Sequence, residues 1–129
     1  MVISRRHINA PNAPLPASAY SQAVEVTGVT RTLHVSGQVP ASPDGTVPAD
    51  PEAQMRLAWA NVVAQLEAAG YRLDHIVKIV TILPDRAHLP LNRRVREEVM
   101  GALRPASTLI VAGLASEAWL VEIDVTACA

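Results

Sequence analysis

The sequence lacks phenylalanine, has a single cysteine and a single lysine, and contains no long apolar run. The lone Cys128 excludes a disulfide framework or a cysteine metal cluster within one chain, and we expect a cytoplasmic protein. No apolar run approaches the roughly 20 residues that a membrane-spanning helix needs, and the first residues lack the apolar stretch of a secretory signal. A formal net charge of −1 argues against a broad basic surface for nucleic acid or for an acidic membrane.

What the sequence does contain is typical of one globular domain spanning residues 1–129. Half of the residues are hydrophobic and 18% are charged. The apolar side chains are mostly Ala, Val, Leu and Ile. Such small aliphatic side chains suit β-branched strands packed on alanine-rich helices.

The order of apolar runs and turn formers predicts a domain that contains both strands and helices. Prolines and small polar residues favour loops over residues 10–19 and 40–50. A capped periodic segment predicts a helix over residues 51–69, and a second helix is predicted over residues 89–103. Strands are predicted over residues 22–26, 30–36, 75–83, 107–114 and 119–126, with a further short strand over residues 2–8.

The strand pattern also predicts pairing and assembly. Thr27, Gly28 and Val29 separate the first two long strands, which indicates a hairpin. In the last strand Val121, Ile123 and Val125 share a face with Trp119, and the opposite face carries Glu122, Asp124 and Thr126. Right-handed crossovers put both helices on one face of the sheet. The other face still carries apolar side chains, so we infer a homo-oligomer that covers it.

Metal and serine-nucleophile sites find little support. The histidines are widely spaced and form no paired metal ligands: His7, His34, His75 and His88. His34 shares a strand face with Ser36, but the sequence lacks the nucleophile elbow of a serine hydrolase. No metal is therefore expected.

A run of charged residues lies on the second predicted helix: Arg93, Arg94, Arg96, Glu97 and Glu98. We interpret it as a solvated helix face with intrahelical ion pairs. The alternative is a contact to phosphate or RNA.

Glu122 is the candidate catalytic carboxylate. It lies mid-strand in a segment whose other face is apolar, so partial burial is one interpretation. A partly buried carboxylate can act as a general base or orient a water molecule. The other interpretation is an exposed glutamate on a half-solvated strand.

Five short segments together resemble the RidA/YjgF family, whose members were once labelled L-PSP endoribonucleases. They are VSGQVP at residues 35–40, LEAAG at 66–70, IVK at 76–78, RPAST at 104–108 and VEIDV at 121–125. The resemblance implies the chorismate-mutase-like α+β fold, a mixed sheet with two helices packed on one face, assembled as a homotrimer with pockets between subunits. It also implies hydrolysis of reactive enamines or imines to a carbonyl compound plus ammonia, without a cofactor.

The resemblance implies site residues position by position. Glu122 corresponds to the glutamate that holds the attacking water, Tyr20 to the pocket tyrosine, and Asn92 to an asparagine at the start of the second helix. The further positions expected to bind substrate are Ser36, Gly37, Ser107, Thr108 and Leu109.

One position departs from the pattern. Where deaminating members read Pro-Ala-Arg, this chain reads Pro105-Ala106-Ser107, and serine cannot supply the bidentate fork that binds a carboxylate. Arg104 lies three positions away, and if the strand already includes it, the odd spacing points its side chain to the opposite face.

Three functions stay open. The favoured one is a deaminase-like hydrolase whose selectivity is altered by Ser107. The alternative is a non-catalytic small-molecule binding or regulatory trimer. RNA cleavage, which the older family label suggests, fits poorly with the net charge and the scarcity of aromatic residues. The expected partners are a small molecule and further copies of the chain, with neither membrane nor nucleic acid.

Overall fold

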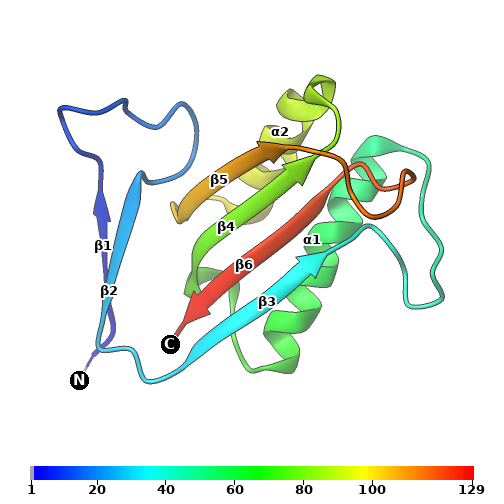
Figure 1. Ribbon diagram of the computed structural model, residues 1–129. Coiled ribbons are helices and arrows are strands. Elements are labelled where there is room, and N and C mark those ends of the chain that lie inside the picture. The colour runs from blue at the N-terminus through cyan, green and yellow to red at the C-terminus, as the bar shows by residue number, and fades with distance from the viewer. Residues whose placement is uncertain (1) are drawn as a thin grey trace.

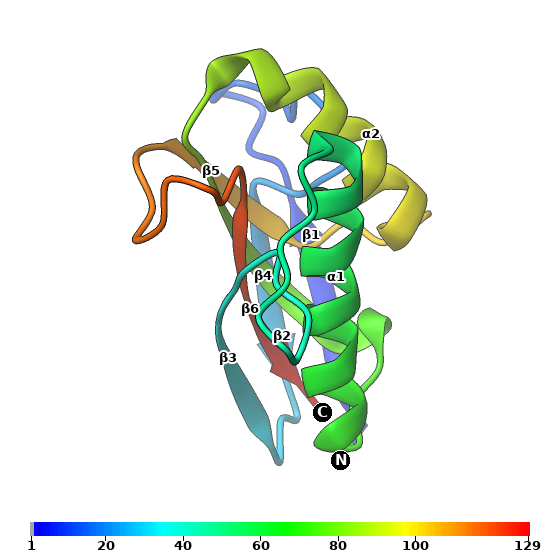
Figure 2. The ribbon, with the colours of Figure 1, turned by 90° about the vertical axis from the view of Figure 1, so that its right-hand side faces the viewer.

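The computed structural model describes residues 2–129 and places two helices on one face of a four-stranded sheet (Figure 1, Figure 2). The strand order is β3 (Thr32–Gln38), β6 (Glu122–Cys128), β4 (Ile76–Leu83) and β5 (Ala106–Val111). Strand β4 runs parallel to β5 and antiparallel to β6, and β3 is antiparallel to β6. The α+β class and the mixed sheet are confirmed.

Both helices begin where the sequence predicts. Helix α1 (Pro51–Ala68) is capped by the Asp50 carboxylate, which accepts a hydrogen bond from the Ala53 amide at 2.9 Å. It ends before Gly70, whose φ of +77° ends the helical path. Helix α2 (Leu89–Met100) stops three residues earlier than predicted, because Gly101 already turns the chain with a φ of +58°.

The hydrophobic core lies between the sheet and the two helices. Its fully buried aliphatic side chains include Met55, Val62, Leu66, Ile79, Ile123 and Val125. Burial alternates along β6, with Glu122, Asp124 and Thr126 half-buried on the face away from the helices. This confirms the two predicted faces of the last strand, although the strand begins at Glu122 and leaves Trp119 in the preceding loop.

The predicted hairpin between the first two long strands is wrong. Strand β2 (Ala23–Thr27) pairs with β1 (Ser4–Ile8), which confirms the short N-terminal strand, and β3 pairs with β6 instead. The amides of Thr30 and Arg31 each donate to the Ala129 carbonyl at 2.9 Å, so the chain turns onto the end of β6. This pairing lets Val35 of β3 join the core beside α1.

The loop between β5 and β6 is longer than predicted, since β5 ends at Val111. Gln54 of α1 fixes this loop, because its Nε2 donates to the carbonyls of Pro48 and Ala118 and its Oε1 accepts from the Leu120 amide, each at 2.8 Å. The Gln54 side chain is buried, with 2% of its surface exposed. One side chain thus joins the loop before α1 to the loop before β6.

The sheet face away from the helices, called the open face below, has no covering element in the described chain (Figure 2). Val80 and Ile82 of β4 are half-buried there, and Ile110 of β5 is 42% exposed. Within residues 2–129, no helix is both long and apolar enough to cross a bilayer.

Candidate functional site

The residues assigned to the site fall into two groups on opposite faces of the sheet. Ser107 pairs in register with Ile79, whose side chain is fully buried in the core beneath the helices. Glu122 pairs with Ile82, on the open face. Strand β4 separates the strands that carry Ser107 and Glu122, so a single chain does not bring these two residues together.

The open-face group consists of Ser36, Gly37 and Glu122. The register between β3 and β6 shifts between Val35 and Gln38, which marks a bulge at Ser36 and Gly37. A Cβ atom built on Gly37 would lie 2.7 Å from Glu122 Cδ and 2.8 Å from its Oε2. The glutamate therefore packs directly on the Gly37 backbone, an approach that only glycine permits.

Glu122 is half-buried rather than exposed, and it belongs to none of the ion pairs found among residues 2–129. A carboxylate of this kind keeps its lone pairs for a water molecule or a substrate proton. Ser36 beside it is exposed on the same strand face as His34.

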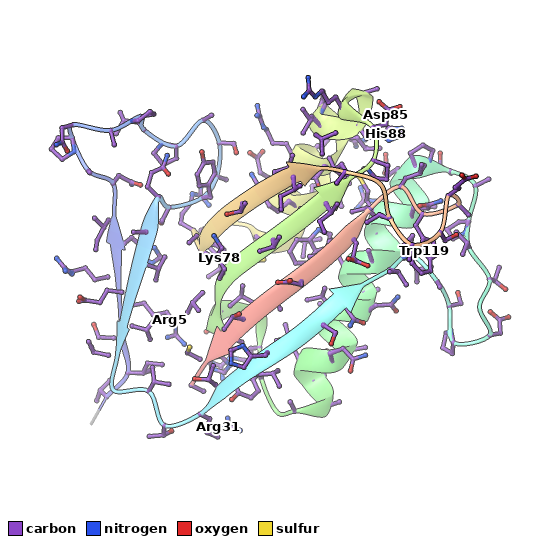
Figure 3. All side chains as sticks on the ribbon, viewed as in Figure 1. Arg5, Arg31, Lys78, Asp85, His88 and Trp119 are labelled. Carbon is purple, nitrogen blue, oxygen red and sulfur yellow. The ribbon has the colours of Figure 1, made fainter. Side chains whose placement is uncertain are left out.

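Thr108 lies on the open face as well, but on β5, with β4 between it and the strand that carries Glu122. It pairs with Val80 on the open face, and its Oγ1 accepts a hydrogen bond of 2.7 Å from the Lys78 ammonium, which Figure 3 shows on that face. Thr108 and Ser107 therefore point to opposite sides of β5. The structure does not place Thr108 with the other residues expected to bind substrate.

The helix-side group consists of Tyr20, Asn92, Ser107 and Leu109, and all four line one cavity of about 200 Å³. The cavity lies between α2, β5 and the loop that precedes β2, and two arginines of α2, Arg93 and Arg96, also line it. The four side chains thus come together around one space, and their role in ligand binding stays a prediction.

Arg96 corrects the interpretation of the charge run as a solvated face. Only 6% of its surface is exposed, whereas the Arg94 side chain is 53% exposed and pairs with Glu52 at 2.6 Å and with Glu98 at 3.8 Å. Arg96 lies one helical turn after Asn92, on the face of α2 that packs inward with Val95. That spacing was the sequence signal that could have identified it.

The surroundings of Arg96 are polar but carry no paired acid. Its Nη2 donates to Ser18 Oγ at 2.8 Å, and its guanidinium lies 5.9 Å from the centre of the Tyr20 ring. Its buried Nε has no hydrogen-bond partner among the described residues. Burial lowers the pKa of the Arg96 guanidinium from its usual value, because the charged form loses contact with water.

Arg104 does not replace the missing arginine at position 107. Its Nη1 donates to the carbonyls of Gly101 and Leu103, both at 2.9 Å. These contacts hold its guanidinium at the C-terminal end of α2, where a cation favours the helix dipole. Arg104 does line a second, larger cavity of about 640 Å³ beside β1, together with Tyr20 and His7.

No group of three or more His, Cys, Asp or Glu side chains that could hold a metal ion is found in the described part of the chain. The four histidines remain apart from one another, in β1, in β3 and in the short 3-10 turns Leu73–His75 and Arg86–His88. The chemistry available at the two groups is therefore that of a carboxylate on one face and an arginine-lined cavity on the other.

Comparison with known sequences identifies relatives over nearly the whole chain. The family model described as endoribonuclease L-PSP matches residues 10–129. A RutC family protein of Pyrococcus horikoshii is 32% identical over 118 residues, which are 90% of this chain and 91% of that protein. The 2-iminobutanoate/2-iminopropanoate deaminase of Escherichia coli K12 is 41% identical over 75 residues, which are 57% of this chain and 56% of the enzyme.

Solved structures give the same result for the fold. The Rid family protein YyfB of Yersinia pestis matches with a TM-score of 0.83 and 32% identity, over 97% of this chain and 98% of that chain. TdcF of E. coli, crystallised with bound serine, matches with a TM-score of 0.71 and 26% identity, over 96% of this chain and 98% of that chain.

Proposed function

Because the chain belongs to the RidA/YjgF family, which the endoribonuclease L-PSP model describes, we propose that it is an imine or enamine deaminase in which Glu122 directs the attacking water. The observation that carries this proposal is the half-buried, ion-pair-free carboxylate of Glu122 seated on the backbone of Gly37. Its similarity to an E. coli enzyme named as a 2-iminobutanoate/2-iminopropanoate deaminase supports the reaction class.

Hydrolysis of the C=N bond requires only a positioned base and a water molecule. The Glu122 carboxylate accepts a proton from water as the water oxygen bonds to the imine carbon, and the electrons of the C=N double bond move to nitrogen. The proton then passes from the carboxyl group to nitrogen, which gives a carbinolamine. The Glu122 carboxylate next moves the hydroxyl proton to nitrogen, the electrons of the O–H bond form the C=O bond, and the C–N bond breaks with its electrons going to nitrogen, so a carbonyl compound and ammonia leave. Water is the only co-reactant, and no oxidant or reductant is needed.

We also propose that the active form is a homotrimer, because the site is divided. The helix-side cavity and Glu122 lie on opposite faces of one sheet, so a complete site needs the cavity of one chain and the carboxylate of a neighbour. The half-buried Val80 and Ile82 on the open face suit such an interface. Sedimentation equilibrium should give the mass of three 13.8 kDa chains, and a monomer at assay concentrations would contradict this arrangement.

The test of the function is the hydrolysis of imines generated in the assay by an amino-acid oxidase. Semicarbazide traps the imine, and a deaminase lowers the amount trapped. Glu122→Gln removes the base and keeps the size of the side chain, so we expect turnover about 10²- to 10⁴-fold lower with the assembly unchanged. Imines from acidic, basic and neutral amino acids should be compared.

The matched control is Glu117→Gln, the same substitution at an exposed glutamate of the loop before β6, which should leave turnover unchanged. Full activity of Glu122→Gln would contradict the assigned role of the carboxylate. A wild-type protein that hydrolyses none of the imines would indicate the other function of this family fold, a trimer that binds a small molecule without converting it.

A further inference from the structure

We infer that Arg96 is the carboxylate-binding group of the helix-side cavity, and that it takes the part of the arginine missing at position 107 for a small 2-oxo or 2-imino carboxylate. The identity of the ligand as an imino acid rests on the proposed function. The binding of a small carboxylate by Arg96 does not.

Arg96 is a buried cation without a counter-ion. With 6% of its surface exposed, it forms none of the ion pairs found among residues 2–129, and its one side-chain hydrogen bond goes to the neutral Ser18 hydroxyl. Its Nε donor has no partner in the described chain. A buried charge is strongly unfavourable unless a partner compensates it, and a bound carboxylate would supply both the opposite charge and the acceptor oxygens.

Glu97, the exposed neighbour of Arg96 on α2, attracts the charge of Arg96 from a distance but forms no ion pair with it. Two further carboxylates, one on α1 and one on α2, are engaged with other arginines. Glu52 and Glu98 bind Arg56 and Arg94 on the outer surface where α1 meets α2, at distances from 2.6 to 3.8 Å. Of the charge run, these exposed pairs include Arg94 and Glu98. Arg96 points away from them into the cavity, toward Tyr20 and Ser18.

Arg96 and Ser107 line the same cavity from opposite walls. Arg96 enters from α2, one turn after Asn92, and Ser107 enters from β5. A guanidinium on either wall therefore reaches the same space. With serine instead of arginine at position 107, the β5 wall carries no cation. The space that the longer side chain would fill is then free for a carboxylate bound to Arg96.

The cavity selects a small anion. Its volume of about 200 Å³ corresponds to roughly seven water molecules, which is enough for a carboxylate with a short side chain. Leu89 and Leu109 line it for an aliphatic group, and Asn92 and Ser107 offer polar partners beside the carboxylate. The N-terminus of α2 has no side-chain cap, so the positive end of the helix dipole adds to the attraction for an anion.

The competing explanation for the burial of Arg96 is a purely structural role, in which its hydrogen bond to Ser18 holds the loop that precedes β2. A pair of probes separates the two roles, because pyruvate carries the carboxylate and pyruvamide has the same shape without the charge. Binding of each is measured by titration calorimetry. For the wild-type protein we expect pyruvate to bind more tightly than pyruvamide.

Arg96→Gln should weaken pyruvate binding about 10- to 100-fold, the range expected for losing a charge-assisted contact, and leave pyruvamide binding unchanged. Ser107→Arg should also weaken pyruvate binding, because a second arginine side chain fills the cavity and faces Arg96. The double variant Arg96→Gln/Ser107→Arg should regain most of the affinity, since it moves the single guanidinium to the other wall. Arg94→Gln, which removes an exposed cation from the same helix, is the matched control.

Three results would overturn the inference: pyruvate binding that is unaffected by Arg96→Gln, equal loss of both probes, or tighter pyruvate binding by Ser107→Arg alone. If Arg96→Gln does not fold, the pyruvate affinity of Ser107→Arg still tests the inference. Repeating the titration with Glu122→Gln separates the two proposals, because the discrimination between the probes does not depend on turnover. If Glu122→Gln retains full turnover, the deaminase mechanism fails while the role of Arg96 is still decided by these affinities.

Discussion

Replacing Gly37 by alanine is expected to lower imine turnover about 10²- to 10⁴-fold, as much as removing the base itself, while the protein stays folded. The new methyl group would occupy the position 2.7 Å from Glu122 Cδ and 2.8 Å from both its Cγ and its Oε2. A real Cβ atom essentially never lies within 3.0 Å of such atoms, so the glutamate must swing away. The atoms that move belong to the end of one flexible side chain, so the free energy of unfolding should change by about 1 kcal/mol or less.

The measurement compares turnover and urea unfolding for Gly37→Ala and for Gly113→Ala, where an added Cβ meets no atom within 4 Å. Both variants should unfold near the wild-type midpoint, and only Gly37→Ala should lose activity. Normal turnover by Gly37→Ala would show that Glu122 works from another position. Loss of stability together with activity would show that the close approach matters for the sheet rather than for the carboxylate.

Replacing Gln54 by leucine is expected to lower the free energy of unfolding by about 3–6 kcal/mol. Leucine matches glutamine in size but leaves the carbonyls of Pro48 and Ala118 and the amide of Leu120 without their 2.8 Å partners. Each backbone group that loses its partner at the buried Gln54 side chain costs about 1–3 kcal/mol, and the typical stability of a small domain is only about 5–15 kcal/mol.

Equilibrium unfolding in urea measures this loss, with Gln65→Leu as the control. Gln65 lies on the same helix and is exposed, and its side chain forms one hydrogen bond, from Nε2 to Gln38 Oε1 at 3.4 Å, so its replacement should change the free energy of unfolding by about 0.5 kcal/mol or less. A Gln54→Leu variant within 1 kcal/mol of the wild type would mean that water satisfies the three backbone groups instead.

Local signals in the sequence predicted the elements whose cause is local. Asp50, Pro51 and Gly70 act within one helical turn of the ends of α1, and those ends were predicted to within one residue. The alternating faces of β6 follow from the two-residue repeat of any strand. The strand partners do not have a local cause. The Thr27-Gly28-Val29 pattern is typical of a hairpin, yet β3 pairs with β6. In that pairing Val35 is buried in the core, and the Thr30 amide donates a hydrogen bond to the Ala129 carbonyl.

In the candidate site, too, the identity of single residues could be predicted from the sequence, whereas their contacts could not. The family resemblance named Glu122 and Gly37 separately, but their contact depends on a bulge between β3 and β6 that no residue pattern reveals. The sequence places Arg96 in one charge run with Arg93 and Arg94, because the three are close along the chain. Its position one turn from Asn92 separates it from the exposed Arg94, and only the packed helix makes that difference in burial visible.

The pairing of Lys78 with Thr108 on the open face has a practical consequence for labelling chemistry. Lys78 is the only lysine, so a reagent that acylates side-chain amines can mark the folded chain at that one side chain. The attached dye, biotin or sensor surface would then sit on the face that we propose is shared between subunits (Figure 3). Coupling through the single thiol offers no simple substitute, because Cys128 is buried at the end of β6. Ligand affinities of this protein are therefore best measured on unlabelled chains, free in solution.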